Sequence, residues 1–201
     1  MKFSKFISYF FHPINFPTIG TLLFFLFIPK FIFKPQEYLI IAVIFIGTYI
    51  FPILLLWLLK KFEMIKSYHM VTIEERKFPL LLFISISFII GHWIYKSAIV
   101  DLLALFFFGY GLSLICVSVF LYLKIKVSLH TLGVSGLIGF LIYFSHFYKI
   151  NIITILAALF VLAGLVASAR LKLRAHQLSE VLLGGIIGMV GQFIVYFIYI
   201  M

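Results

Sequence analysis

The chain has 201 residues, of which 65% are hydrophobic and 11% charged, and its mean hydropathy is +1.24. A soluble domain of this length could not hide so much apolar surface, so the composition predicts a membrane protein with several spans. The formal net charge is +10, but the lysines and arginines are scattered through short polar connections. We therefore expect contacts with lipid headgroups and anionic ligands, and no nucleic-acid partner.

Uncharged runs long enough to cross a bilayer follow one another along the chain, since a helical span needs about 20 apolar residues. Six runs are clear: 38–59, 78–95, 102–123, 131–148, 150–169 and 181–201. An earlier run, 13–29, is shorter and carries three prolines, so a tilted span, a re-entrant segment and an interfacial helix remain open for it. The sequence predicts an all-α fold, a polytopic helical bundle of six spans with a possible seventh, in one domain over 1–201.

Small residues recur in the last three of these spans at a spacing that lets helix backbones approach closely. They are Gly133, Gly136 and Gly139, then Gly164 and Ser168, then Gly184 and Gly188. We expect these three spans to form the tightly packed part of the bundle and to hold the functional core, over about 120–201.

A short polar run between the last two clear spans contains Arg170, His176 and Glu180. Ionisable groups beside hydrocarbon are costly, which makes them candidates for function. If His176 and Glu180 share one face of a helix, the carboxylate can accept from one imidazole nitrogen and leave the other as a free lone pair. Arginine suits forked binding of phosphate. The pattern predicts phosphate chemistry, and the alternative is a set of interfacial side chains that meet lipid headgroups.

A second polar cluster lies two spans earlier at the matching membrane depth and contains Lys124, Lys126, Ser128 and His130. Ser128 is a candidate N-cap for the following span, with His130 in its first turn. A second histidine is what phosphoryl transfer needs to protonate the leaving oxygen. Either lysine could neutralise a phosphate oxygen.

The two clusters resemble signatures of the type 2 phosphatidic acid phosphatase and haloperoxidase superfamily. Ala169-Arg170-x5-His176-x3-Glu180 is similar to its third signature, Ser-Arg-x5-His-x3-Asp. Val127-Ser128-Leu129-His130 is similar to its second signature, Pro-Ser-Gly-His. Four positions differ from the family residues, namely Val127, Leu129, Ala169 and Glu180. The first signature, Lys-x6-Arg-Pro, is not present as such, and candidates for its cations are Lys124, Lys126 and Arg76, which precedes Pro79.

The resemblance implies an enzyme that removes phosphate from a lipid without a metal ion or other cofactor. His176 would attack phosphorus and form a phosphohistidine, Glu180 would orient His176, and His130 would protonate the leaving oxygen and then activate water. The phosphate oxygens would be held by Arg170, Ser128, Lys126, Lys124 and Arg76. The expected substrate is a phosphomonoester or pyrophosphate on a phospholipid, polyprenyl or glycolipid chain.

Two other functions remain open from the sequence. A degenerate member of the family would bind anionic lipid or scaffold a partner without catalysis, and a small transporter would line a path with its polar clusters. We expect a multi-pass protein of the cytoplasmic membrane. The resemblance places the site on the outer, periplasmic face, whereas the excess of loop cations beside the clusters favours the cytoplasm.

Overall fold

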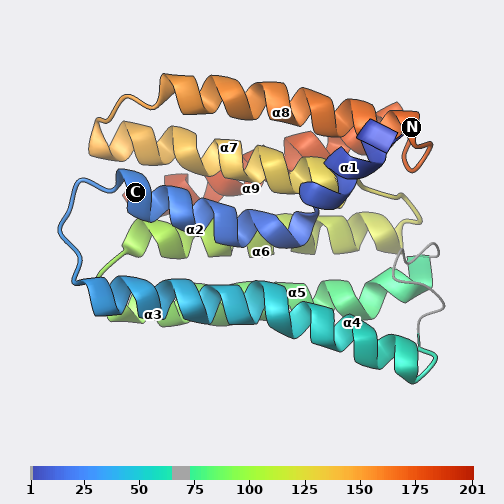
Figure 1. Ribbon diagram of the computed structural model, residues 1–201, viewed down its shortest axis with the longest axis horizontal. Coiled ribbons are helices and arrows are strands. Elements are labelled where there is room, and N and C mark those ends of the chain that lie inside the picture. The colour runs from blue at the N-terminus through green and yellow to red at the C-terminus, as the bar shows by residue number, and fades with distance from the viewer. Residues whose placement is uncertain (1, 65–72) are drawn as a thin grey trace.

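Long helices make up nearly all of the chain that the computed structural model describes, residues 2–64 and 73–201, without the side chains of residues 73 and 74. The helices run back and forth along one axis (Figure 1). Helices satisfy their own backbone hydrogen bonds, as hydrocarbon requires. Seven helical stretches within the described residues are long and apolar enough to cross a membrane, so the all-α membrane fold is confirmed. The spans are Lys2–Phe27, Lys34–Lys61, Glu75–Ser97, Asp101–Tyr122, Leu129–Tyr148, Ile153–Lys172 and Leu178–Ile200.

The run 13–29, whose nature the sequence left open, belongs to the first of these spans, which begins earlier than predicted. The span consists of α1 (Lys2–Phe10), a short 3₁₀ turn (Pro13–Asn15) and α2 (Phe16–Phe27). Pro13 and Pro17 each lie in the first turn of a helical element, where a missing backbone N–H costs nothing. The prolines therefore divide the segment into helices without preventing it from crossing.

The next span contains a local wide turn. Helices α3 (Lys34–Phe45) and α4 (Phe51–Lys61) are joined by a π-helical turn over Ile46–Ile50. Pro52 follows this turn, has no N–H for the ladder and crowds the preceding carbonyls, so the wider turn keeps the helix continuous. The hydroxyl of Thr48 donates to the carbonyl of Ile44 at 2.8 Å, which stabilises the same region.

Helix α5 (Ile73–Ser97) begins earlier than the sequence predicted. The predicted span was the uncharged run 78–95, and the helix continues past the start of that run into polar residues. Arg76 therefore lies in the first turns of a helix, and Pro79 lies inside that helix.

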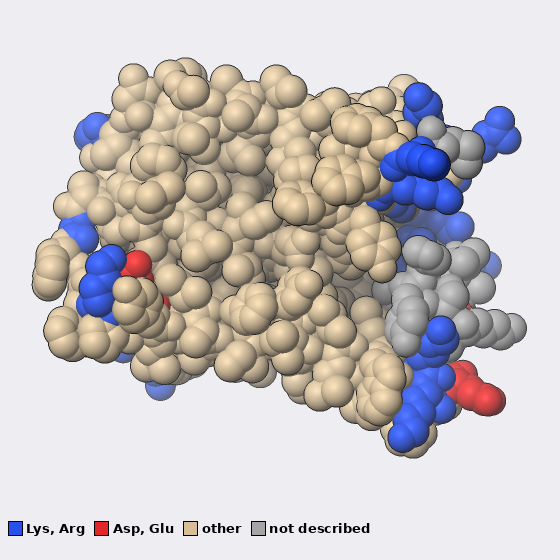
Figure 2. All heavy atoms as spheres, viewed as in Figure 1, with Lys and Arg blue, Asp and Glu red and all other residues tan. Residues whose placement is uncertain are grey.

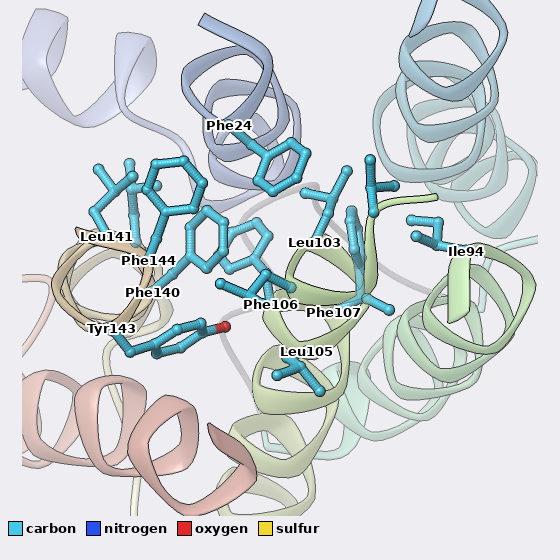
Figure 3. Close-up of a cluster of buried hydrophobic side chains, with 14 of the residues drawn as sticks. Phe24, Ile94, Leu103, Leu105, Phe106, Phe107, Phe140, Leu141, Tyr143 and Phe144 are labelled. Carbon is cyan, nitrogen blue, oxygen red and sulfur yellow. The ribbon is translucent and has the colours of Figure 1, made fainter. Parts of the chain in front are cut away.

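The centre of the bundle is an aromatic cluster between α2, α6 (Asp101–Tyr122) and α7 (Leu129–Tyr148) (Figure 3). The rings of Phe106 and Phe140 lie with centroids 4.6 Å apart, and Phe24 contacts the same group from α2. Burial of these large side chains fixes α6 and α7 as the inner helices.

Helices α7 and α9 (Leu178–Ile200) approach closely through glycines of α9. A Cβ on Gly184 would collide with the carbonyl oxygen of Ser128, and one on Gly188 would collide with that of Leu132. The predicted close packing is therefore found for these two glycines. For Gly164 it is wrong: nothing lies within 4 Å of an added Cβ, because this side of α8 (Ile153–Lys172) is on the outside of the bundle.

Charged side chains gather at the two ends of the bundle and leave its middle apolar (Figure 2). The N-terminus, the end of α4, the start of α5 and the connections α6–α7 and α8–α9 share one end (Figure 1). Eleven described Lys and Arg residues belong to that end, namely Lys2, Lys5, Lys60, Lys61, Arg76, Lys77, Lys124, Lys126, Arg170, Lys172 and Arg174. The opposite end has four, Lys30, Lys34, Lys96 and Lys149. Both polar clusters of the sequence thus lie at the more basic end.

Candidate functional site

His176 and Glu180 meet at the start of α9. His176 lies in the turn before the helix, Gln177 is the N-cap, and Glu180 occupies the third helical position. One carboxylate oxygen of Glu180, Oε2, is 2.6 Å from His176 Nδ1 and also accepts from the backbone N–H of Gln177 at 3.3 Å. The sequence predicted that both residues share one face of a helix. This is wrong, because His176 lies before the helix and only Glu180 is part of it. A capping box, which directs the N3 side chain back toward the chain before the helix, brings them together.

The contact with Glu180 sets the protonation of His176. A carboxylate only accepts, so Nδ1 carries the proton and Nε2 is left with its lone pair. The imidazole is 4% exposed. Burial lowers the pKa of His176 below 6.5, the hydrogen bond to Glu180 opposes that shift, and the positive charges of Arg170 and Arg76 lower the pKa further. His176 is therefore neutral at neutral pH, which is the form a nucleophile needs.

Two arginines from different helices lie beside His176. Arg170 is at the end of α8, and Arg76 is near the start of α5. Their charges interact with each other, and the charge of Arg76 also interacts with Glu180. Arg170 Nε is buried and has no hydrogen-bond partner among the described residues. Two guanidinium charges that act on each other, one of them with a buried N–H that has no partner among the described residues, form a place where an oxyanion would be stabilised.

Ser128 and His130 belong to the start of α7, as predicted. Ser128 is the N-cap and its hydroxyl accepts from the backbone N–H of Thr131 at 3.5 Å. Its side chain is fully buried, and its backbone N–H donates to the carbonyl of Glu180 at 3.1 Å. These contacts bring the second polar cluster to the first. The cap is the role that the structure gives Ser128, and its contact with phosphate stays a prediction.

The lysines of the second cluster lie on the connection between α6 and α7. Lys124 is exposed, with a left-handed backbone at φ 62°, and Lys126 is half-buried. The cations whose charges lower the pKa of His176 are Arg170 and Arg76. Among the candidates for the missing first signature, Arg76 is therefore the one that the structure brings to His176.

The N-terminal segment contributes two residues that the sequence analysis did not identify, Ser8 on α1 and His12, the N-cap of the 3₁₀ turn. Arg170 Nη1 donates to the hydroxyl oxygen of Ser8 at 2.6 Å, and His130 Nε2 lies 3.1 Å from the carbonyl oxygen of Ser8. The ring of His12 meets that of His130 edge-on, with centroids 5.3 Å apart. Polar Ser8 and His12 in an aromatic-rich stretch were the available signal, but both precede the run 13–29 to which the span interpretation was limited.

No family model, curated protein or solved structure matches this chain. Within the described residues, no group of three or more His, Cys, Asp or Glu side chains is arranged to hold a metal ion. The arrangement offers a neutral histidine oriented by a carboxylate, a second histidine, and two arginines for an anion.

Proposed function

We propose that this protein is an integral membrane lipid phosphatase that works through a phosphohistidine, a divergent member of the type 2 phosphatidic acid phosphatase superfamily. The observation that carries the proposal is the 2.6 Å contact between His176 Nδ1 and Glu180 Oε2, beside Arg170 and Arg76. This contact leaves a nucleophilic nitrogen next to the groups that would bind phosphate.

The proposed reaction has two steps. His176 Nε2 attacks phosphorus and the bond from phosphorus to the lipid oxygen breaks. His130 enters this step as the imidazolium, protonated on both nitrogens, and gives the lipid oxygen the proton from Nδ1. Water then attacks the phosphohistidine, His130 takes a proton from the water, and inorganic phosphate leaves with His176 restored. Arg170 and Arg76 stabilise the charge on the phosphoryl oxygens, and each such donor is worth roughly 2–4 kcal/mol in the transition state.

The depth of the site supports a lipid substrate. His130 and His176 lie at helix starts, and Arg170 at a helix end, so the site is at headgroup level and not at the bilayer centre. A transporter would place such groups at the midplane. We propose a phosphomonoester or pyrophosphate on a phospholipid, polyprenyl or glycolipid chain as the substrate.

The charge distribution supports a cytoplasmic site. With seven spans, the N-terminus joins the end that carries the site, and eleven described cations lie there against four at the other end. The positive-inside rule favours the cytoplasm for the richer end. This proposal replaces the periplasmic placement that the resemblance implied.

A fusion at the C-terminus tests the side, because the last helix ends at the end opposite the site (Figure 1). Green fluorescent protein attached after Met201 stays dark when exported in unfolded form to the periplasm, which is the outcome expected for a cytoplasmic site. A bright fusion together with an inactive alkaline phosphatase fusion would place the site outside.

The activity is tested by phosphate release from lipid phosphates and pyrophosphates by purified protein in detergent with EDTA present. Release is expected from wild type and from His92→Ala, a histidine near the opposite end of α5, and is expected to vanish in His176→Ala. Equal release from wild type and His176→Ala would contradict the mechanism.

The second candidate function is binding of anionic lipid without turnover. Leu129 in the second cluster, where the family has glycine, favours it, because a side chain there crowds the phosphate. This candidate predicts that phosphate protects the protein against unfolding while no substrate releases phosphate.

A further inference from the structure

Helix α1 contacts the site through Ser8, to which the proposed mechanism assigns no role. The hydroxyl oxygen of Ser8 accepts from Arg170 Nη1 at 2.6 Å. Its carbonyl oxygen lies 3.1 Å from His130 Nε2, and its hydroxyl oxygen lies 3.4 Å from the same nitrogen. One residue thus contacts both the proposed phosphate-binding cation and the proposed acid–base.

The contact with the carbonyl sets the tautomer of His130. A carbonyl oxygen can only accept, so Nε2 must carry the proton and the lone pair of the neutral ring lies on Nδ1. Which nitrogen carries the proton decides where a histidine can give or take one during catalysis. The N-terminal helix therefore controls a property on which the acid–base step depends.

The contact with the hydroxyl fixes the orientation of Arg170. A guanidinium is a rigid planar fork, so an anchor on one nitrogen fixes the directions of the remaining N–H groups. The Nε–H of Arg170 is buried without a partner among the described residues. With Nη1 held by Ser8, the Nε–H is the part of the fork that would bind an oxygen atom of a phosphate.

The position of Ser8 is set by packing. Ile7 is buried against Val166 and Ala169 of α8, directly before Arg170 in the chain. Ser4 lies one turn earlier on α1 and is buried, 6% exposed, whereas Ser8 is half-buried. Ser4 is therefore a matched control for effects on the docking of α1 alone.

We propose that Ser8 is a positioning residue of this site, which orients Arg170 through its hydroxyl and fixes the tautomer of His130 through its carbonyl. The catalytic consequence depends on the proposed phosphatase function, whereas the two contacts themselves do not.

The experiment compares wild type, Ser8→Ala, Ser8→Thr and Ser4→Ala. In Ser8→Ala, Arg170 loses its anchor, so we expect KM to rise, and the affinity for inorganic phosphate to fall, by about tenfold. Ser8→Thr keeps the hydroxyl and is expected to restore both, and Ser4→Ala is expected to match wild type. Nitrogen-15 NMR of labelled histidine should show the Nε2–H tautomer for His130, assigned with His130→Gln.

Several results would overturn the inference. Unchanged kinetics and phosphate affinity in Ser8→Ala would contradict the role of the Ser8 hydroxyl in orienting Arg170. An Nδ1–H tautomer of His130 would contradict the role of the Ser8 carbonyl in fixing the tautomer. Tighter phosphate binding by Ser8→Ala would mean that Ser8 competes with phosphate for Arg170. If wild type releases no phosphate from any lipid, the proposed function fails, but phosphate affinity and the tautomer still decide the role of Ser8.

Discussion

The backbone N–H of Ser128 donates to the backbone carbonyl of Glu180 at 3.1 Å, which joins the two polar clusters of the chain. Beside it, the hydroxyl of Thr131 donates to the carbonyl of Val181 at 3.0 Å. The starts of α7 and α9 are thereby held together, and with them His130 and His176. The backbone carbonyl of Glu180 accepts the hydrogen bond from Ser128, and its carboxylate orients His176.

Gly184 lets the starts of α7 and α9 approach closely, so a side chain at this position is expected to lower stability. In Gly184→Ala the new methyl group collides with the Ser128 carbonyl and lies 2.5 Å from Thr131 Oγ1, so the helices must separate. We expect a loss of about 1–3 kcal/mol in the free energy of unfolding. Gly185→Ala is the control, since nothing lies within 4 Å of its Cβ. Thermal unfolding in detergent measures both, and equal stability of the two variants would contradict the close contact.

Glu180→Gln is expected to lower kcat by about a hundredfold, because an amide can still accept from Nδ1–H but cannot stabilise the positive charge that develops on His176. Glu180→Asp keeps the charge and is expected to retain more activity than Glu180→Gln. Phosphate release at saturating substrate measures kcat for both. A Glu180→Gln enzyme as fast as wild type would mean that the carboxylate serves only the cap.

Arg76→Ala is expected to raise KM and lower kcat/KM by about 10²-fold or more, as removal of one donor to the transition-state charge does. Lys124→Ala serves as the control, because this exposed residue is at the same end of the bundle and carries the same charge. We expect that variant to stay close to wild type. If Lys124→Ala is the more damaging change, the lysines and not Arg76 supply the cation of the missing signature.

The pH dependence of activity follows from His176. Burial lowers its pKa below 6.5, so the neutral nucleophile persists at neutral pH, and on the acidic side activity is expected to fall as the pH drops below 6.5. A pH profile of kcat/KM measures this acidic limb. A limb centred above pH 7 would contradict the lowered pKa.

Stability should change in the same pH range. The unfolded chain binds the proton on His176 more readily than the folded chain does, so stability is lost as the pH falls from 6.5 to the lower folded-state pKa. His176→Asn cannot titrate, and its stability is expected to vary less over this range. Denaturation followed at several pH values measures the difference between the two proteins.

Much of the fold was predictable because each span corresponds to an uncharged run of neighbouring residues. The ends of the helices were harder to predict from these runs. Helix α5, for example, extends through Arg76, because a helix continues beyond the hydrocarbon while its polar side chains meet headgroups. The run 13–29 was ambiguous because a proline inside a helix and one at its start look alike until the helix boundaries are known.

The candidate site was predictable in part. His176 and Glu180 were paired from their spacing, although the capping box that joins them differs from the expected helix face. Ser8 was missed because its partners, His130 and Arg170, are 122 and 162 residues away in the chain. No local pattern records such a contact.

The sequence by itself determined that this is an all-α membrane protein with polar clusters at the span ends, because hydrophobic run length and backbone hydrogen bonding in lipid leave no other fold for such a chain. Only the tertiary structure decided which polar residues meet. Helix packing, through Gly184 and Gly188 on one side and Ile7 on the other, brings α1, α7, α8 and α9 together at one end. Side-chain contacts between distant segments depend on that packing and on no spacing along the chain.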